Sequence, residues 1–560
     1  MNIDEELTTI LQNNSNLKKM KEYLEQNTFF SLTGYEGFFK AFLIKKIKEY
    51  SKTGKIILIV KDEHTLDKIK NDLKVITNQI FEFNYFSPLV YKGIGSKSTI
   101  FNERIKFLIN FYKKNPGIYI TVLKSLLSKI PNQNTLLKNI YKIEKNTKID
   151  TVDIEKTLIT LGYEKTLRVT IPGEFTIKGE IIDLYPFGEQ NPIKIVLNFD
   201  KIEEIRKFNP LTQLKQDNEI LEFQILPKKE IIWKNEIINS LKTKIKSVEY
   251  NKILEELNFK KEAKTEEMFY PLVANTYLSD EIEKQTPIVN FEINNFEKEI
   301  EKIHQEYEKL YKEAKEAGKN TIDPKRILLN SKTFNLKSDV LFSKIKSSKS
   351  KEVVEFKIES ERSFFSNIVL TKEEFKNWLK NGFKIIIAAE SESQKEKLKY
   401  IFKELPKVSI EVLKISSSLI IEEEKIAIIL ESNIFNTGQK INKAFESSKT
   451  KAIDSFIEIE KNSHVVHINH GIGIFRQIKR IKTSSLEKDY IEIEYAEGEK
   501  LFIPIEQTNL IQKYIGSNPK NIKLDKISSK TWIKNKASAK KKNRRDCRQI
   551  NRTLLKKRKY

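Results

Sequence analysis

The sequence contains a single cysteine, Cys547, among its 560 residues. One cysteine cannot form an internal disulfide bond, and it cannot supply a cysteine-rich zinc site. No stretch approaches the roughly 20 consecutive apolar residues that a membrane-spanning helix needs. The first ten residues, MNIDEELTTI, lack the basic start and apolar run of a secretion signal. We therefore expect a cytoplasmic protein without membrane contact, and its length predicts about three to five domains.

A phosphate-binding loop is also missing where the sequence pattern would place it. A glycine-containing turn leads into a helical pattern ending near Tyr50, and the apolar run 55–60 is typical of a buried strand. At such a turn an ATPase carries GxxxxGK[ST], which cradles phosphates and holds magnesium. Here only Gly34 and Gly37 remain, and Phe38 and Phe39 follow where small residues are needed. The sequence predicts a degenerate loop with no catalytic residue and no bound cofactor.

The formal net charge of +24 suggests nucleic-acid binding, but its distribution weakens this interpretation. Residues 540–560 contain eleven Lys or Arg and one Asp, so ten of the 24 positive charges lie in this tail. The richness in Lys, Ile and Asn is also what an AT-rich genome produces. We expect the body of the protein to be only moderately basic.

The remaining pattern predicts a multidomain α/β protein. Strand and helix patterns alternate to residue 146, short strands follow, and the α/β pattern then returns with an amphipathic helix from Phe296 to near Gly318. The apolar runs 118–122, 383–389 and 426–430 are typical of buried strands. The predicted domains are a degenerate P-loop-type α/β body (1–146 and 211–343), an inserted α+β domain (147–210), a linker (344–362), an α/β spacer domain (363–450), a small Tudor/SH3-like β-barrel (460–520) and a helix start with an aberrant basic tail (525–560).

The barrel has the clearest pattern in the chain, from His464 to Tyr514. Apolar and charged residues alternate after Tyr490 and again after Lys500, and the turn AEGE separates the two runs. This arrangement predicts a hairpin closed by a loop with glycine at a positive φ angle.

The strings VVHINHGIG, DYIEIEYAEGEKLFIP and IQKY in this segment resemble the RNA-polymerase-interacting module of the bacterial transcription-repair coupling factor. The resemblance implies binding to the β subunit of RNA polymerase. We expect binding through a strand edge, and the candidate contact residues are Leu486, Tyr490, Ile491 and Ile493.

A second string, PGEFTIKGEIIDLYP, resembles the inserted domain that the coupling factor shares with the excision-repair protein UvrB, through which both dock on UvrA. The resemblance implies UvrA contacts at Lys178, Lys194 and Phe199. The family usually has arginine at the position of Lys178, and lysine does not reproduce the planar fork of arginine. A solvated strand lysine without a partner is the alternative interpretation.

The resemblance covers nearly the whole chain and implies transcription-coupled nucleotide excision repair. The full-length family is an ATP-driven translocase on double-stranded DNA, and its motor, with ATP and magnesium, is expected beyond residue 560. A UvrB-like damage-binding helicase is one alternative, and it would need a working loop near Gly34. A basic nucleic-acid-binding protein that acts through its tail is another.

Three of the five histidines, His464, His467 and His470, lie close together. Their spacing permits a metal site, but odd offsets along a strand point to opposite faces, and no Cys or nearby carboxylate completes a ligand set. We predict no metal.

The tail after Lys542 breaks the helical pattern that precedes it. If AT-rich codons for residues 543–560 are read one base later, they encode IEEIADKLIELYSKRES, a balanced amphipathic helix similar to the one that follows this module in the family. We therefore expect that a one-base slip in the run encoding Lys540 to Lys542 truncated a longer gene. Resequencing that run tests the idea.

Overall fold

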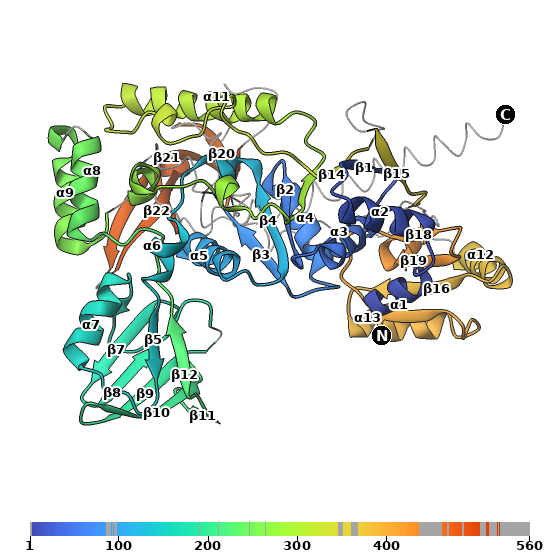
Figure 1. The fold of residues 1–560 in the computed structure, drawn as a ribbon, viewed down its shortest axis with the longest axis horizontal. Coiled ribbons are helices and arrows are strands. Elements are labelled where there is room, and N and C mark those ends of the chain that lie inside the picture. The colour runs from blue at the N-terminus through green and yellow to red at the C-terminus, as the bar shows by residue number, and fades with distance from the viewer. Residues whose placement is uncertain are drawn as a thin grey trace. The chain divides into compact units, whose positions relative to one another are not determined.

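The computed structural model describes residues 3–85, 91, 93, 98–189, 191–210, 212–245, 247–263, 265–344, 351–359, 368–435, 462–467, 470–483, 486–504, 511–513, 524 and 526. The chain divides into two compact units, Met1–Gly438 and Gln439–Tyr560 (Figure 1). The expected tail after Lys542, including Cys547, lies outside the described residues, as do residues 345–350 and 360–362 of the predicted linker.

The first unit is built on a seven-stranded parallel sheet in the order β15-β1-β14-β13-β2-β4-β3. Its central strands are continuous apolar runs because helices cover both faces (Figure 1). The strands are β1 (Phe30–Thr33), β2 (Lys55–Val60), β3 (Ile80–Phe83), β4 (Gly117–Val122), β13 (Ile288–Phe291), β14 (Val340–Phe342) and β15 (Glu352–Glu355). The helices of this body are α2 (Ser15–Glu25), α3 (Phe39–Tyr50), α4 (Glu63–Leu73), α5 (Ser98–Tyr112), α6 (Gln133–Leu137), α8 (Asn235–Lys244), α9 (Ser247–Lys260), α10 (Tyr270–Val273) and α11 (Phe296–Glu316).

The inserted domain carries a six-stranded sheet in the order β11-β10-β9-β8-β7-β6, with α7 (Thr151–Thr160) packed on it. The two-stranded ribbon of β5 (Tyr141–Glu144) and β12 (Glu222–Ile225) joins this domain to the body. The sheet continues past the predicted boundary at residue 210, because β11 pairs with β10. Its strands are β6 (Glu164–Lys165), β7 (Glu174–Lys178), β8 (Ile181–Leu184), β9 (Ile193–Asn198), β10 (Lys201–Phe208) and β11 (Lys215–Glu219).

The predicted spacer forms a four-stranded sheet in the order β17-β16-β19-β18. Ile386, Leu419 and Ile428 of this sheet belong to the same apolar core as Ile3 and Leu7 of the N-terminal helix, so the spacer shares its core with the body. The elements are α1 (Ile3–Ile10), α12 (Ile368–Lys380), β16 (Lys384–Ala389), α13 (Glu392–Ile401), β17 (Ser409–Val412), β18 (Leu419–Ile421), β19 (Ile426–Leu430) and α14 (Glu431–Phe435).

The described part of the second unit is a five-stranded antiparallel sheet in the order β23-β22-β21-β20-β24. Its strands are β20 (His464–His467), β21 (Gly471–Thr483), β22 (Leu486–Glu494), β23 (Lys500–Pro504) and β24 (Ile511–Lys513). The predicted turn lies between β22 and β23, where Glu497 and Gly498 have positive φ angles of 61° and 78°. Gly473 is required at a close approach, because a Cβ atom there would lie 2.5 Å from Ile493 Cγ2.

Candidate functional site

The degenerate loop between β1 and α3 is filled by the protein itself. Gly34 has a φ angle of 68°, and a Cβ atom at this position would lie 1.7 Å from the carbonyl oxygen of Phe356. Phe38 and Phe39 are fully buried in the apolar core. The main chain and these two rings therefore occupy the region in which an ATPase loop would leave room for phosphates.

Two polar side chains near this loop, Tyr35 and Lys40, have partners within the protein. The Tyr35 hydroxyl donates a hydrogen bond of 2.9 Å to Glu292 Oε1, and burial raises the pKa of Tyr35. Lys40 Nζ lies 3.9 Å from Asp72 Oδ2, and burial lowers the pKa of Lys40. These contacts connect the loop and the start of α3 to the segment after β13 and to α4.

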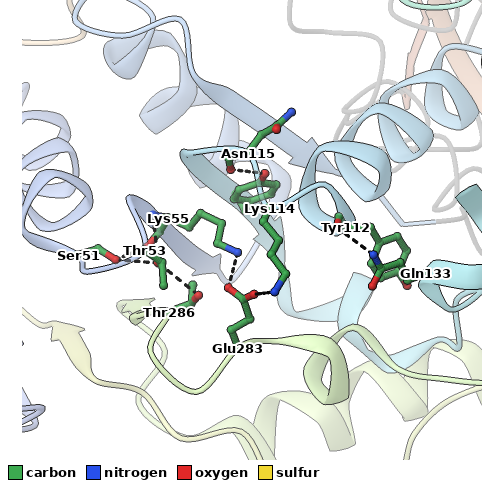
Figure 2. Close-up of polar contacts among 10 residues, drawn as sticks. Ser51, Thr53, Lys55, Tyr112, Lys114, Asn115, Gln133, Glu283 and Thr286 are labelled. Atoms are coloured by element: carbon green, nitrogen blue, oxygen red, sulfur yellow. Dashed lines mark hydrogen bonds and ion pairs between the residues drawn. The ribbon is translucent and has the colours of Figure 1, made fainter. Parts of the chain in front are cut away.

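A second polar cluster lies at the opposite end of the sheet, where strands β2, β4 and β13 begin. Figure 2 shows that Lys55 and Lys114 both point toward Glu283, with 2.6 Å between each Nζ atom and a carboxylate oxygen. Both lysines lower the pKa of the Glu283 carboxyl below its usual range. The hydrogen bond from Lys114 has the larger effect, and that from Lys55 follows. Thr53 and Thr286 meet beside them, with 3.4 Å between their hydroxyl oxygens. The sequence analysis missed this cluster because its members come from segments far apart in the chain.

The predicted UvrA-contact residues lie on the six-stranded sheet of the inserted domain. Lys178 is exposed at the end of β7, and Phe199 is 86% exposed in the turn between β9 and β10. The two turns are neighbours, because the N–H groups of Leu197 and Phe199 donate to Glu180 in the turn after Lys178. The structure thus brings Lys178 and Phe199 to one end of the sheet.

Lys194 does not offer a free charge, contrary to the sequence prediction. Its ammonium group is paired with Asp183 on the neighbouring strand, and both side chains are largely buried. The ammonium also lies 5.0 Å from the centre of the Phe208 ring. Asp183 was not recognised because its pairing with Lys194 depends on the register between β8 and β9.

In the second unit, Ile491 and Ile493 are fully buried in the core of the sheet. From Tyr490 to Glu494, β22 pairs with β21 on one side and with β23 on the other. The prediction that these two isoleucines lie at a strand edge is therefore wrong, because both backbone edges are paired and both side chains face inward. Tyr490 is half-buried on the same strand.

Leu486 is in a different position along the same strand. Residues 486–489 pair with β21, but within the described residues β23 pairs only with Tyr490–Glu494. The β21–β22 hairpin therefore extends beyond the rest of the described sheet, with one backbone edge of residues 486–489 left unpaired by β23. Leu486 was one of the four residues that the sequence analysis predicted for a strand-edge contact.

The three clustered histidines lie at the start of the same sheet. His467 is buried, its ring centre is 4.7 Å from that of His470, and burial lowers the pKa of His467 to about 4. No group of three or more His, Cys, Asp or Glu side chains is placed to hold a metal ion in the described part of the chain. No helix among the described residues is long and apolar enough to cross a membrane.

Comparisons with known proteins match both sheets that carry these candidate residues. A sequence model described as the UvrB interaction domain matches residues 141–231, and one described as the CarD-like/TRCF RID domain matches residues 459–515. The chain is 92% identical over 541 residues to the transcription-repair-coupling factor of Borreliella burgdorferi, a match that covers 97% of this chain and 48% of the relative. Nearly the whole of this chain is therefore similar to about half of a transcription-repair-coupling factor.

More distant members of the family match over the same extent. The transcription-repair-coupling factor of Staphylococcus aureus is 23% identical over 578 residues, a match that covers 95% of this chain and 49% of the relative. The chain thus spans about half the length of the curated relatives it matches. The two matched domains account for the inserted sheet and the five-stranded sheet, and the near-complete coverage of this chain includes the α/β body as well.

Proposed function

We propose that this chain is a docking platform for transcription-coupled nucleotide excision repair, which binds RNA polymerase through its second unit and UvrA through its inserted domain. The observation that carries the proposal is that the two family matches fall on the two sheets whose ends present the candidate contacts. The ATP-driven translocation of the whole family on double-stranded DNA is assigned to the half that this chain does not span.

The polymerase contact is proposed at the projecting part of the β21–β22 hairpin, on a module of the Tudor/SH3-like barrel type. An unpaired backbone edge can add a strand from another protein, with main-chain hydrogen bonds for affinity and alternate side chains for selectivity. Among the described residues, β23 pairs with none of residues 486–489, and its pairing with β22 begins at Tyr490. The β subunit of RNA polymerase is the proposed partner.

Shortening the hairpin tests this assignment. Removal of Ile481, Lys482, Glu487 and Lys488 deletes two register pairs, so the remaining residues keep their faces and the turn is unchanged. We expect the shortened chain to lose co-purification with the polymerase β subunit and to keep the hydrogen-exchange protection of the sheet core. Ile491→Val is the matched control, expected to bind normally. Binding by the shortened chain at the wild-type level would refute the edge contact.

The UvrA contact is proposed at the end of the inserted sheet, where two neighbouring turns carry an exposed lysine and an exposed aromatic ring. Lys178 and Phe199 have the chemistry of an interface anchor, an apolar ring with a charge at its rim. Lys194 acts within the sheet, because Asp183 neutralises it. We expect Phe199→Ala and Lys178→Glu each to weaken binding of purified UvrA by about tenfold or more. Lys156→Glu, at an exposed ion pair with Asp153 on α7, serves as a charge control.

This chain is proposed to bind neither ATP nor magnesium. The filled loop at Gly34 supports the proposal, because the Phe356 carbonyl oxygen lies against the glycine. Calorimetric titration of the full chain with ATP and magnesium is expected to show no saturable heat. Saturable binding that Gly34→Val abolishes in a folded variant would overturn the proposal.

A further inference from the structure

Two hairpin turns at the end of the inserted sheet have different residues at the same position. Residues 178 and 181 are register partners, as are residues 198 and 201, so each turn has two central residues. The first central residue has a positive φ angle in both turns, 59° at Gly179 and 57° at Phe199. Glycine adopts this conformation freely, whereas a residue with a Cβ atom is strained in it.

The strained turn presents its ring to solvent. Phe199 is 86% exposed, so its ring contributes almost nothing to the core of the domain. Strained backbone persists only where the surrounding structure enforces it, and it is concentrated at functional sites. A large apolar side chain held at a fixed exposed position is typical of an interface anchor.

Glu180, the second central residue of the first turn, holds the second turn in place. Its carboxylate oxygen Oε1 accepts a hydrogen bond of 3.3 Å from the N–H group of Phe199. Its carbonyl oxygen accepts one of 2.8 Å from the N–H group of Leu197. Asp200, the residue that follows Phe199, forms an ion pair of 2.7 Å with Lys148. The residues on both sides of Phe199 are therefore tied to neighbouring segments.

We propose that Glu180 is a positioning residue for UvrA: its carboxylate holds Phe199 in the left-handed backbone conformation that presents the ring to the partner. The inference rests on the proposed UvrA contact of this domain. Holding the ring in its bound orientation before UvrA arrives reduces the conformational entropy lost on binding. Lys178 lies in the strand that leads into the adjoining turn.

Substitutions at Glu180 separate the hydrogen bond from the charge. Glu180→Ala removes the acceptor, and Glu180→Gln keeps an acceptor oxygen without the negative charge. We expect Glu180→Ala in the full chain to weaken binding of purified UvrA by about tenfold, and Glu180→Gln to bind within about twofold of the wild type. Glu236→Ala, which removes an exposed carboxylate from α8, outside the inserted domain, is expected to bind normally.

Two further variants give readouts that a purely structural role would not produce. Phe199→Gly is expected to raise the urea midpoint of unfolding, because it relieves the positive φ angle, while it weakens UvrA binding by about tenfold. Phe199→Ala in the Glu180→Ala background is expected to add little further loss, because the two residues act together.

The outcomes distinguish the positioning role of Glu180 from the proposed UvrA contact on which it rests. Wild-type binding by Phe199→Ala would overturn the UvrA contact itself. Loss of binding in Phe199→Ala with wild-type binding in Glu180→Ala would leave the contact in place and overturn the positioning role. Equal losses in Glu180→Gln and Glu180→Ala would assign the effect to charge and overturn the hydrogen-bond argument. A lowered urea midpoint in Phe199→Gly would show that the ring is structural, which also contradicts the inference.

Discussion

Ile491 distinguishes a core position from a contact position in the five-stranded sheet of the second unit. Its side chain is fully buried in a small cluster with Val465, Phe475, Ile493 and Tyr495, among others. Truncation of such a residue to alanine costs about 2–5 kcal/mol, the lost transfer free energy plus the cavity. Because this core has few members to collapse into the cavity, we expect a loss of about 3 kcal/mol for Ile491→Ala.

The measurement is hydrogen exchange of the full chain, read by mass spectrometry from peptides of β20 to β23. A loss of about 3 kcal/mol corresponds to a fall of about a hundredfold in protection. Peptides from Met1–Gly438 are expected to be unchanged, because that unit is compact by itself. Ile491→Val is expected to lose only about 0.5–1.5 kcal/mol and serves as the matched control.

Ile491→Arg would place a charge in this core, with a desolvation penalty of several kcal/mol. We expect the module to unfold, so that loss of polymerase binding by this variant reflects loss of the fold. A well-protected Ile491→Arg module that selectively fails to bind polymerase would refute the reasoning. Unchanged protection in Ile491→Ala would refute it as well.

Three further predictions follow from buried or crowded groups. Arg104→Ala is expected to cost about 3–5 kcal/mol in urea unfolding, because it leaves a buried carboxylate unpaired. Burial lowers the pKa of His467 to about 4, below its value in the unfolded chain. The free energy of unfolding of the second unit is therefore expected to be highest above about pH 6.5 and to fall as the pH decreases toward 4. His467→Asn should weaken this pH dependence, as measured by hydrogen exchange. Gly34→Ala is expected to lower the thermal midpoint more than Gly179→Ala, since both glycines have positive φ angles but only Gly34 meets Phe356.

Periodicity alone predicted many of the local elements. The apolar runs expected at 55–60, 118–122 and 426–430 are confirmed as β2, β4 and β19, and the amphipathic helix from Phe296 is confirmed as α11, which ends at Glu316. Apolar residues at helical spacing face the core, as Ile300, Tyr307, Leu310 and Ala314 do. These patterns succeed because burial of one face depends on spacing along the chain.

The sequence did not predict that the spacer domain shares an apolar core with the α/β body. Its own strands were found, but the core that it shares with Ile3 and Leu7 of α1 joins residues more than 370 positions apart. A composition change near residue 350 resembles a linker whether or not the domains on either side pack together. Shared cores therefore need the tertiary structure.

By itself, the sequence determined the multidomain α/β fold class and the similarity to transcription-repair-coupling factors, because each depends on residue types at fixed spacing. The tertiary structure decided which candidate residues are available to a partner. Alternation along β22 showed that Ile491 and Ile493 share one face, but only the pairing with both neighbouring strands showed that these isoleucines face inward. The charge of Lys194 was visible in the sequence, whereas its neutralisation by Asp183 depends on strand register. The exposed, strained position of Phe199 has the same origin, because it is set by contacts between turns that are distant in sequence.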